Sequence, residues 1–377
     1  MQSDSLEFSL LSIFSFLSFF TFFIVHKLSH KIFNGSLFDN DYDKPQAFHK
    51  NDVPRCGGLA SILSIFIFVL LNNLLFSSLY LDYLVLGAGL FLIGFLDDIK
   101  INFSPKARLT LMTIFLYACV IIFSIEINGI DLVILNQILS INLVYVFFIV
   151  LCFLFIINGS NLIDGFNGLL AFQLIIINSI LLFINIENEF QTISIFITAQ
   201  IIILLVFLLF NFPSAKIFMG DGGAYLFGTF TALNVIETNN LNPSISSFFY
   251  CILLFYLFFE VFFSFFRKIK QKKSPIKPDS EHLHMLSYKF LSFDKSDRKY
   301  NHLNALYINL VYCMLVLPSI IVNESGVLCK LWFLTLIIIY ILIYLRLNSF
   351  VKKKLIYKHL NYYGQVAELV YALVLGT

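Results

Sequence analysis

Residues 192–211 read TISIFITAQIIILLVFLLFN and contain no charged side chain. An α-helix needs about 20 apolar residues to cross the hydrocarbon layer of a membrane, so this run predicts a transmembrane helix. Similar runs occur along most of the chain. We therefore expect an all-α, polytopic membrane protein with a single integral domain at residues 1–347 and eleven transmembrane helices. The expected spans are 8–26, 57–77, 80–97, 109–125, 141–158, 168–186, 192–211, 222–238, 246–266, 303–322 and 329–347.

The composition supports a membrane location. Hydrophobic residues make up 59% of the 377 residues and charged residues 13%, whereas about 25% are charged in an average soluble domain. A soluble protein of this size could not bury so much apolar surface. The six cysteines include no C-x-x-C pair, which argues against a metal cage or a disulfide scaffold. The net charge of +2 says little about partners; we expect the lipid bilayer and no nucleic acid.

The lysine and arginine positions predict the orientation. If the N-terminus lies outside and the spans alternate, 24 of the 25 Lys and Arg residues fall on the inner side, and only Lys330 lies at an outer end. Such residues concentrate in cytoplasmic loops. We expect a periplasmic N-terminus and a cytoplasmic C-terminus. The polar clusters all fall in inner segments, so we expect the active site to be built from cytoplasmic loops.

The first polar cluster is KPQAFHKNDVPRCGG at residues 44–58. Basic residues set among prolines and glycines indicate an irregular loop. Lys44, His49 and Arg55 are candidates for binding a phosphate. An ordinary positively charged inner loop explains the segment equally well.

The second cluster, GFLDD at residues 94–98, ends an apolar run. Two adjacent carboxylates at the mouth of a span are costly unless they are used. Asp97 and Asp98 could hold a divalent cation or take a proton, or they could merely end the helix at the interface. We favour a functional pair because Lys106 and Arg108 follow closely.

The third cluster is NGSNLIDGFNG at residues 158–168, which contains no Lys or Arg. If its first part is helical, Asn158, Asn161 and Asp164 share one face. Amides with a carboxylate suit the edge of a nucleotide base and a metal ion. Asn, Asp and Gly also dominate turns, and the segment by itself favours a turn.

The fourth cluster, KIFMGDGG at residues 216–223, opens the eighth expected span. Its glycines let the backbone approach an oxyanion, and the N-terminus of the following helix favours a phosphate. Asp221 could ligate Mg²⁺ or cap the helix. The small residues also indicate close packing or a bound ligand rather than lipid contact.

The fifth cluster, PDSEHLHM at residues 278–285, lies in the largest inner loop. His282 and His284 could bind a metal or donate to a diphosphate, although two histidines are a weak signal. Glu260 lies within the ninth span, two helical turns before Arg267. An acid at that depth is expected to face the bundle interior, either as a structural partner or as a catalyst.

Together these five motifs resemble, in content and order, those of the polyprenyl-phosphate N-acetylhexosamine-1-phosphate transferases, over roughly residues 8–347. That family includes the peptidoglycan phospho-MurNAc-pentapeptide transferase and the enzymes that start O-antigen, enterobacterial common antigen and teichoic acid synthesis. The resemblance implies in-line attack of undecaprenyl phosphate on a UDP-sugar, with Mg²⁺ or Mn²⁺, releasing UMP. It also implies the inner (cytoplasmic) membrane of a bacterium. Members can form homodimers, although this sequence shows no interface signal.

The resemblance carries roles onto matching positions. Asp97, Asp98, Lys106 and Asp164 become catalytic candidates, and Asp164 and Asp221 become metal ligands. With the loop residues above, the substrate-binding candidates are Lys44, His49, Arg55, Asn158, Asn161, Asn167, Glu260, Arg267, His282 and His284.

The sequence departs from the family pattern at two places. Asn167 stands where the family usually has a second Asp, which puts a metal or base role there in doubt. The motif at residues 282–285 is H-L-H-M rather than a run of three histidines. That favours a UDP-GlcNAc or similar UDP-N-acetylhexosamine enzyme of surface polysaccharide synthesis over the peptidoglycan transferase, which is the alternative within the family. A membrane transporter is the alternative of another class, but transporters place polar residues near the midplane, often in internal repeats.

The cytoplasmic tail, residues 348–377, ends in GQVAELVYALVLGT from Gly364. This stretch resembles the in-frame translation of a leucine transfer-RNA gene. We hypothesise that it is read-through into a neighbouring gene; the alternative is a short amphipathic helix at the membrane interface.

If the read-through hypothesis is correct, deletion of residues 364–377 leaves activity intact, because the stretch has no evolved role. Release of UMP by the truncated protein measures this. Coding DNA that cannot fold as a transfer-RNA acceptor and D-arm would contradict the hypothesis.

Overall fold

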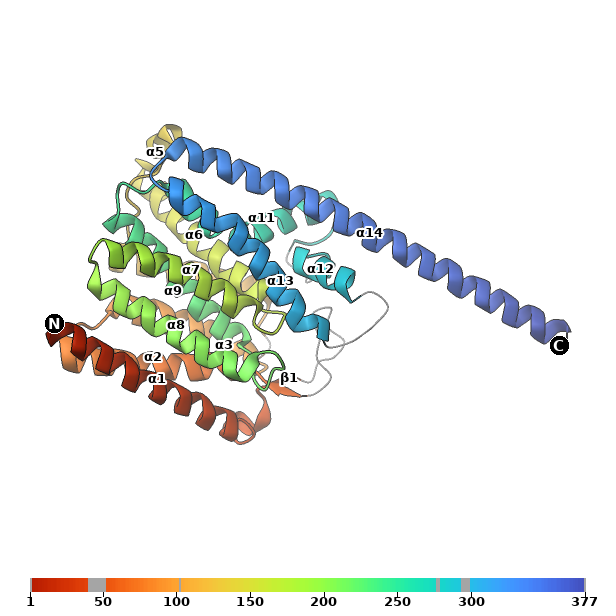
Figure 1. The fold of residues 1–377 in the computed structure, drawn as a ribbon, viewed down its shortest axis with the longest axis horizontal. Helices are drawn as coiled ribbons and strands as arrows, with labels where there is room; N and C mark the ends of the chain where they lie inside the picture. The colour runs from red at the N-terminus through yellow and green to blue at the C-terminus, as the bar shows by residue number, and fades with distance from the viewer. Residues whose placement is uncertain (1, 40–51, 102, 276–278, 293–298, 376–377) are drawn as a thin grey trace.

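The structure is a computed structural model that describes all residues except 1, 40–51, 102, 276–278, 293–298 and 376–377. Two short strands, β1 (Phe38–Asp39) and β2 (Val53–Pro54), pair antiparallel, and the remaining elements are helices (Figure 1). The α-helices are α1 (Gln2–Leu28), α2 (Gly57–Phe76), α3 (Leu81–Asp98), α4 (Pro105–Ile122), α5 (Val133–Leu139), α6 (Asn142–Ile163), α7 (Leu169–Glu187), α8 (Gln191–Asn211), α9 (Gly220–Leu241), α10 (Ser247–Leu253), α11 (Phe255–Lys270), α12 (Leu283–Leu291), α13 (Lys299–Val316) and α14 (Gly326–Leu375); the 3₁₀ helices are η1 (Ile32–Gly35) and η2 (Leu317–Val322).

Each of the eleven expected spans coincides with a helix or, for the ninth, with the pair α10 and α11. Within the described part of the chain, eight helices are long and apolar enough to cross a membrane, and α10 with α11, bent by 76°, makes a ninth candidate. The remaining two are α3, which carries three aspartates, and α9, which is rich in small and polar residues. The all-helical, polytopic architecture is confirmed. The count of eleven and the orientation stay predictions.

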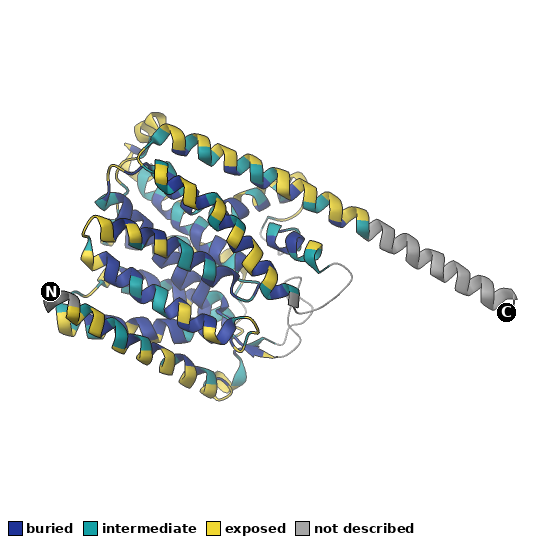
Figure 2. Ribbon diagram, viewed as in Figure 1, coloured by how far each residue is buried: buried dark blue, intermediate teal, exposed yellow. Residues whose placement is uncertain are grey.

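The outer helices present apolar side chains to the surroundings. Figure 2 shows exposed residues along α1 and α14 and buried residues on the helices between them. Phe8 and Phe16 of α1, for example, are 75% and 68% exposed. Such a surface suits contact with lipid, since α-helices satisfy their own backbone hydrogen bonds there.

Helix α9 lies inside the bundle, packed against α2, α3, α6 and α7, and most of its residues are buried. Glycines permit this packing. A Cβ added to Gly58 of α2 would lie 2.4 Å from the backbone nitrogen of Gly223, and one added to Gly94 of α3 would lie 2.6 Å from the backbone of Asp221. The close packing predicted for the start of this helix is confirmed.

An amide cluster joins α9 to α7 and α8 within the bundle. The Nδ2 of Asn234 donates to Oδ1 of Asn178 at 3.1 Å and to Oε1 of Gln200 at 2.9 Å. All three side chains are fully buried. Because such amides find no water in a membrane interior, they hold the three helices in one register.

We expect Asn234→Leu to lower the free energy of unfolding by about 1–2 kcal/mol, because the amides of Asn178 and Gln200 lose their shared partner. Thermal unfolding in detergent measures this. Gln137→Leu, at an exposed position of α5, is the control and should cost less than about 0.5 kcal/mol. Equal stability of Asn234→Leu and the wild type would show that the cluster does not hold these helices together.

Candidate active site

The end of α3 and the start of α9 bring three aspartates together. Asp97 and Asp98 are the last residues of α3, and Asp221 lies in the first turn of α9. The contact between Gly94 and the backbone of Asp221 allows the two helix ends to approach closely. These acids, predicted from separate motifs, therefore belong to one cluster.

Asp98 caps the N-terminus of α9. Its two carboxylate oxygens accept hydrogen bonds from the backbone N–H groups of Asp221 and Gly222, each at 2.9 Å. The side chain is buried. Gly220 has a φ of +77°, and a Cβ there would lie 2.6 Å from Oδ2 of Asp98. The carboxylate thus replaces hydrogen bonds that a helix start cannot make internally, and of the two adjacent acids Asp97 is the one open to a ligand.

Arg108 bridges the two remaining carboxylates. Its Nη1 lies 2.8 Å from Oδ2 of Asp221 and 3.3 Å from Oδ2 of Asp97. Lys106 was predicted to be the basic residue of this motif, but Lys106 is exposed, and no described contact places its side chain in the cluster. Residues two apart lie on different sides of a helix. The helical period of α4 could therefore have indicated that only one of these two basic residues faces the acids.

The third motif contributes Asn161 and Asp164. Helix α6 continues through Ile163, as the predicted common face required, and Nδ2 of Asn161 donates to Oδ2 of Asp221 at 3.3 Å. Burial raises the pKa of Asp164 to about 7; the negative charge of Asp221 adds to this and Arg55 opposes it. A nearby cation would therefore favour the ionised form of Asp164.

Two other amides of this motif serve the fold. Asn158 donates to the carbonyl of Leu154 within its own helix, at 2.7 Å. Asn167 donates through Nδ2 to the carbonyl of Pro213, at 2.8 Å, and its N–H donates to Oδ1 of Asn301, at 2.8 Å. Asn167 therefore holds its loop against neighbouring segments, and the described contacts give neither residue a link to the acids.

Arg55 joins the cluster from the β2 side. Its Nη2 lies 2.7 Å from Oδ2 of Asp39, and its Nη1 lies 3.8 Å from Oδ1 of Asp98. The β1–β2 pairing places Asp39 opposite Val53 and so brings it near Arg55. Asp39 was not among the predicted site residues, because two-residue strands leave no periodic signal in the sequence. Lys44 and His49 lie outside the described residues.

The histidine motif forms a second polar cluster around Glu260. His282 Nδ1 lies 3.0 Å from Oε1 of Glu260, and Arg267 pairs with Asp279 at 2.9 Å and with Glu281 at 3.0 Å. Glu260 is buried, as expected of an acid at that depth. Its contacts make it a structural partner of His282, one of the two roles left open.

His284 differs from its neighbour. Its Nδ1 lies 3.3 Å from the hydroxyl of Tyr256. Burial lowers the pKa of His284 to about 3 despite the attraction of Glu260, so its ring is neutral. The two histidine rings are parallel, with centroids 5.5 Å apart.

Phe166 links the two clusters. Its ring contacts the ring of His284 edge-on, with centroids 5.8 Å apart, and Phe166 follows Asp164 by two residues. Helices α6 and α11 also meet closely, since a Cβ on Gly159 would lie 2.2 Å from the carbonyl oxygen of Leu257. The predicted assembly of distant motifs at one end of the bundle is therefore present.

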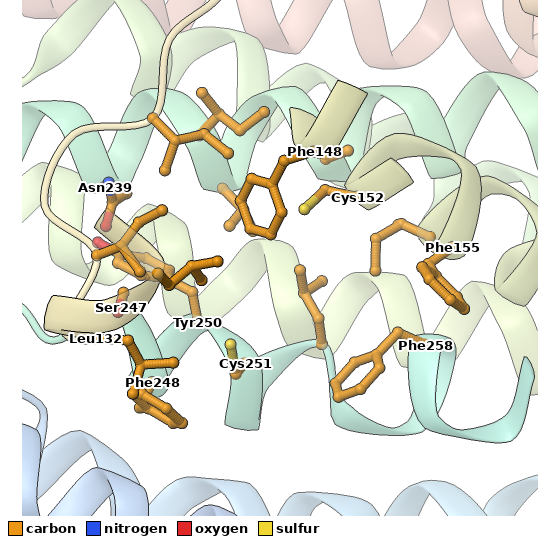
Figure 3. Close-up of a pocket in the computed structure, with 18 of the residues that line it drawn as sticks. Leu132, Phe148, Cys152, Phe155, Asn239, Ser247, Phe248, Tyr250, Cys251 and Phe258 are labelled. Carbon is orange, nitrogen blue, oxygen red and sulfur yellow. The ribbon is translucent and has the colours of Figure 1, made fainter. Parts of the chain in front are cut away.

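An apolar cavity of about 390 Å³ lies further along α6 and α9 (Figure 3). Phe148, Cys152 and Phe155 of α6 line it together with Tyr250 and Cys251 of α10. Phe155 precedes Asn161 by six residues, or about 9 Å along a helix axis. The cavity can accept hydrocarbon but offers little for a charged ligand.

Residues 80–239 match the family described as Glycosyl transferase family 4. This range includes the Asp97–Asp98 pair, the third motif and Asp221. An undecaprenyl-phosphate α-N-acetylglucosaminyl 1-phosphate transferase of Thermotoga maritima is 26% identical, over 64% of this chain and 71% of the relative.

Two further relatives extend the comparison. A probable undecaprenyl-phosphate N-acetylglucosaminyl 1-phosphate transferase of Bacillus subtilis is 24% identical, over 83% of this chain and 86% of the relative. A phospho-N-acetylmuramoyl-pentapeptide-transferase of a Geobacillus species is 33% identical, over 50% of this chain and 62% of the relative.

We expect Asp98→Asn to lower the free energy of unfolding by about 2 kcal/mol, because the new amide group would face a backbone N–H at the start of α9. Asp97→Asn is the matched control. The Asp97 side chain is 37% exposed, so its substitution should cost less than about 0.5 kcal/mol. Thermal unfolding of both variants in detergent decides the matter, and equal losses would contradict the capping role.

Proposed function

We propose that this chain, which belongs to the polyprenyl-phosphate N-acetylhexosamine-1-phosphate transferases, transfers N-acetylhexosamine 1-phosphate from a UDP-sugar to undecaprenyl phosphate and releases UMP. The proposal rests mainly on one observation: Asp97 and Asp221 both form ion pairs with the guanidinium of Arg108. Carboxylates and cations together at one end of an apolar bundle suit a reaction between phosphates at a membrane surface.

The donor set fits a hard divalent cation. Asp97 and Asp221 both form ion pairs with Nη1 of Arg108. A metal ion at about the same position could therefore be bound by both carboxylates. Asp164 lies close enough to Asp221 for its pKa to respond. In the described part of the chain, no three His, Cys, Asp or Glu side chains form a metal cage on their own. Mg²⁺ commonly takes one or two carboxylates and completes its shell with water and substrate phosphates.

A bound cation and Arg108 would both stabilise negative charge on the phosphates. Bound by Asp221 together with Asp97 or Asp164, Mg²⁺ would neutralise charge that develops on the diphosphate. Arg108 would move from bridging carboxylates to contacting a phosphate, because guanidinium groups suit either partner. Asn161 would orient the nucleotide sugar through its amide.

The reaction is an in-line displacement. An oxygen of the lipid phosphate attacks the β-phosphorus of the sugar diphosphate, and the bond from that phosphorus to the bridging oxygen breaks as UMP leaves. Positioning contributes most of the catalysis. The lipid phosphate is largely ionised near neutral pH, so the step does not require Asp97 to act as a base.

The cavity along α6 supports a lipid acceptor. Its nearest lining residue on α6, Ile156, lies about 7.5 Å along the helix axis from Asn161, its walls are apolar, and it extends from there toward Asn239 near the end of α9. A phosphate held at the acid cluster could therefore place its hydrocarbon chain against the same helix.

The donor that we propose is UDP-GlcNAc or a similar UDP-N-acetylhexosamine, and the product would start a lipid-linked surface polysaccharide such as O-antigen in the inner membrane of a bacterium. Support comes from the H-L-H-M motif at residues 282–285 and from the names of the Thermotoga and Bacillus relatives. The pentapeptide transferases among the relatives make UDP-MurNAc-pentapeptide the competing donor.

We expect purified protein with undecaprenyl phosphate and Mg²⁺ to release UMP from UDP-GlcNAc or UDP-GalNAc. Asp221→Asn should lower the rate about 100-fold or more, because several kcal/mol of charge stabilisation would be lost. Asp82→Asn, at the opposite end of α3 from Asp97, is the control and should keep the wild-type rate.

Release from UDP-MurNAc-pentapeptide alone would assign the chain to the peptidoglycan branch. Absence of release from every donor, in folded protein, would contradict the proposal.

A further inference from the structure

His282 lies between two carboxylates. Its Nδ1 is 3.0 Å from Oε1 of Glu260, and its Nε2 is 3.2 Å from Oδ1 of Asp279. Carboxylate oxygens accept hydrogen bonds and cannot donate them when ionised. An imidazole can donate from both ring nitrogens only as the protonated imidazolium. Each ring nitrogen of His282 therefore faces a carboxylate within ion-pair distance.

Glu260 accepts hydrogen bonds from the start of α12 and from α14. The N–H of Leu283, the first residue of α12, donates to Oε1 at 3.2 Å, and the hydroxyl of Tyr340, on α14, donates to Oε2 at 2.5 Å. Glu260 itself belongs to α11. One buried carboxylate therefore ties the start of α12 to α11 and α14.

The charges alternate along this chain of contacts. Arg267 holds Asp279 at 2.9 Å, so Asp279 is fixed on the side of His282 that lies away from Glu260. Lys268 lies 3.9 Å from the same carboxylate. A buried network in which every charge has an opposite neighbour is rigid, and losing one member leaves another charge unpaired.

The network determines where His284 lies. His284 follows His282 by two residues, its carbonyl accepts from Nδ2 of Asn304 at 2.9 Å, and its ring contacts Phe166. The Nε2 of His284 is buried and has no hydrogen-bond partner among the described residues. The described contacts therefore leave a ring nitrogen available on His284 but none on His282.

We propose that Glu260 is a positioning residue for the transferase reaction: with Asp279 it holds His282 as an imidazolium between two carboxylates, and this pairing orients the α12 start and His284 beside the Asp164 loop. The expected effect on kcat rests on the proposed function. The expected state of the His282 ring rests on the contacts alone. It assigns His282, which the family motif suggests as a substrate ligand, to the support of the site.

The kinetic test compares Glu260→Gln with a matched control. Glu260→Gln keeps the shape but removes the charge, and we expect kcat for UMP release to fall about 10- to 100-fold, the usual effect of losing a supporting contact, with KM for the UDP-sugar little changed. Glu237→Gln is the control, because Glu237 also accepts from a tyrosine, Tyr83 at 2.7 Å, but lies near the far end of α9 from Asp221. It should keep the wild-type kcat.

A double-mutant cycle distinguishes positioning from general destabilisation. Because Glu260 acts through His282, Glu260→Gln should add little to the loss of kcat already caused by His282→Gln. Additive losses, or a kcat for Glu260→Gln equal to that of Glu237→Gln, would overturn the proposal.

The structural test does not depend on the reaction. In ¹⁵N-histidine-labelled protein at neutral pH, the His282 signal, assigned by its absence in His282→Gln, should show both ring nitrogens protonated, and Glu260→Gln should remove this signature. A neutral His282 ring in the wild type would overturn the proposal. Its imidazolium signature without UMP release from any donor would instead contradict the proposed function alone.

Discussion

The carboxylate of Asp98 accepts two backbone hydrogen bonds from the start of α9, and the rest of the site depends on this contact. The first N–H groups of a helix have no intrahelical partners, and where the helix start is buried the protein itself must supply acceptors. Asp98 fills that need from α3. It thereby fixes Asp221 next to Asp97, and the glycines at positions 94 and 220 leave room for the approach. The motif in the sequence suggests Asp98 as a catalytic residue, but in this arrangement Asp98 holds Asp221 in place.

The same logic applies at the second cluster. Glu260 accepts the backbone N–H of Leu283 at the start of α12, as Asp98 does at the start of α9. In both cases a carboxylate on one helix sets the first turn of another helix, where the helix dipole also favours a negative charge. Two loops that are far apart in the sequence are thus held by one type of interaction, and Phe166 brings them into contact.

The sequence predicted the helices well because length and apolar character determine them. It also predicted which motifs meet, since the alternation of spans places the ends of α3 and α6 and the start of α9 on one side. It did not predict which basic side chain contacts which acid. Arg108 rather than Lys106 reaches the acids, and Asp39 reaches Arg55 through a strand pair only two residues long. Such choices depend on the rotation of a helix about its axis and on short-range pairing, which apolar periodicity does not specify.

The two clusters differ in the ratio of basic to acidic side chains, and this difference suggests different functions. In the second cluster the carboxylates of Glu260, Asp279 and Glu281 face His282, Arg267, Lys268 and Lys273 within ion-pair distance, so each carboxylate has a basic partner within the cluster. In the first, the described ion pairs bring two guanidiniums, Arg55 and Arg108, to four carboxyl groups: Asp39, Asp97, Asp98 and Asp221. Asp164 adds a fifth carboxyl, whose raised pKa reflects its burial and the nearby negative charge. Uncompensated carboxylates at the edge of a membrane bundle are costly, and a divalent cation would remove most of that cost. The first cluster is therefore where we propose that a divalent cation binds with the phosphates of the substrates, and the second cluster supports it.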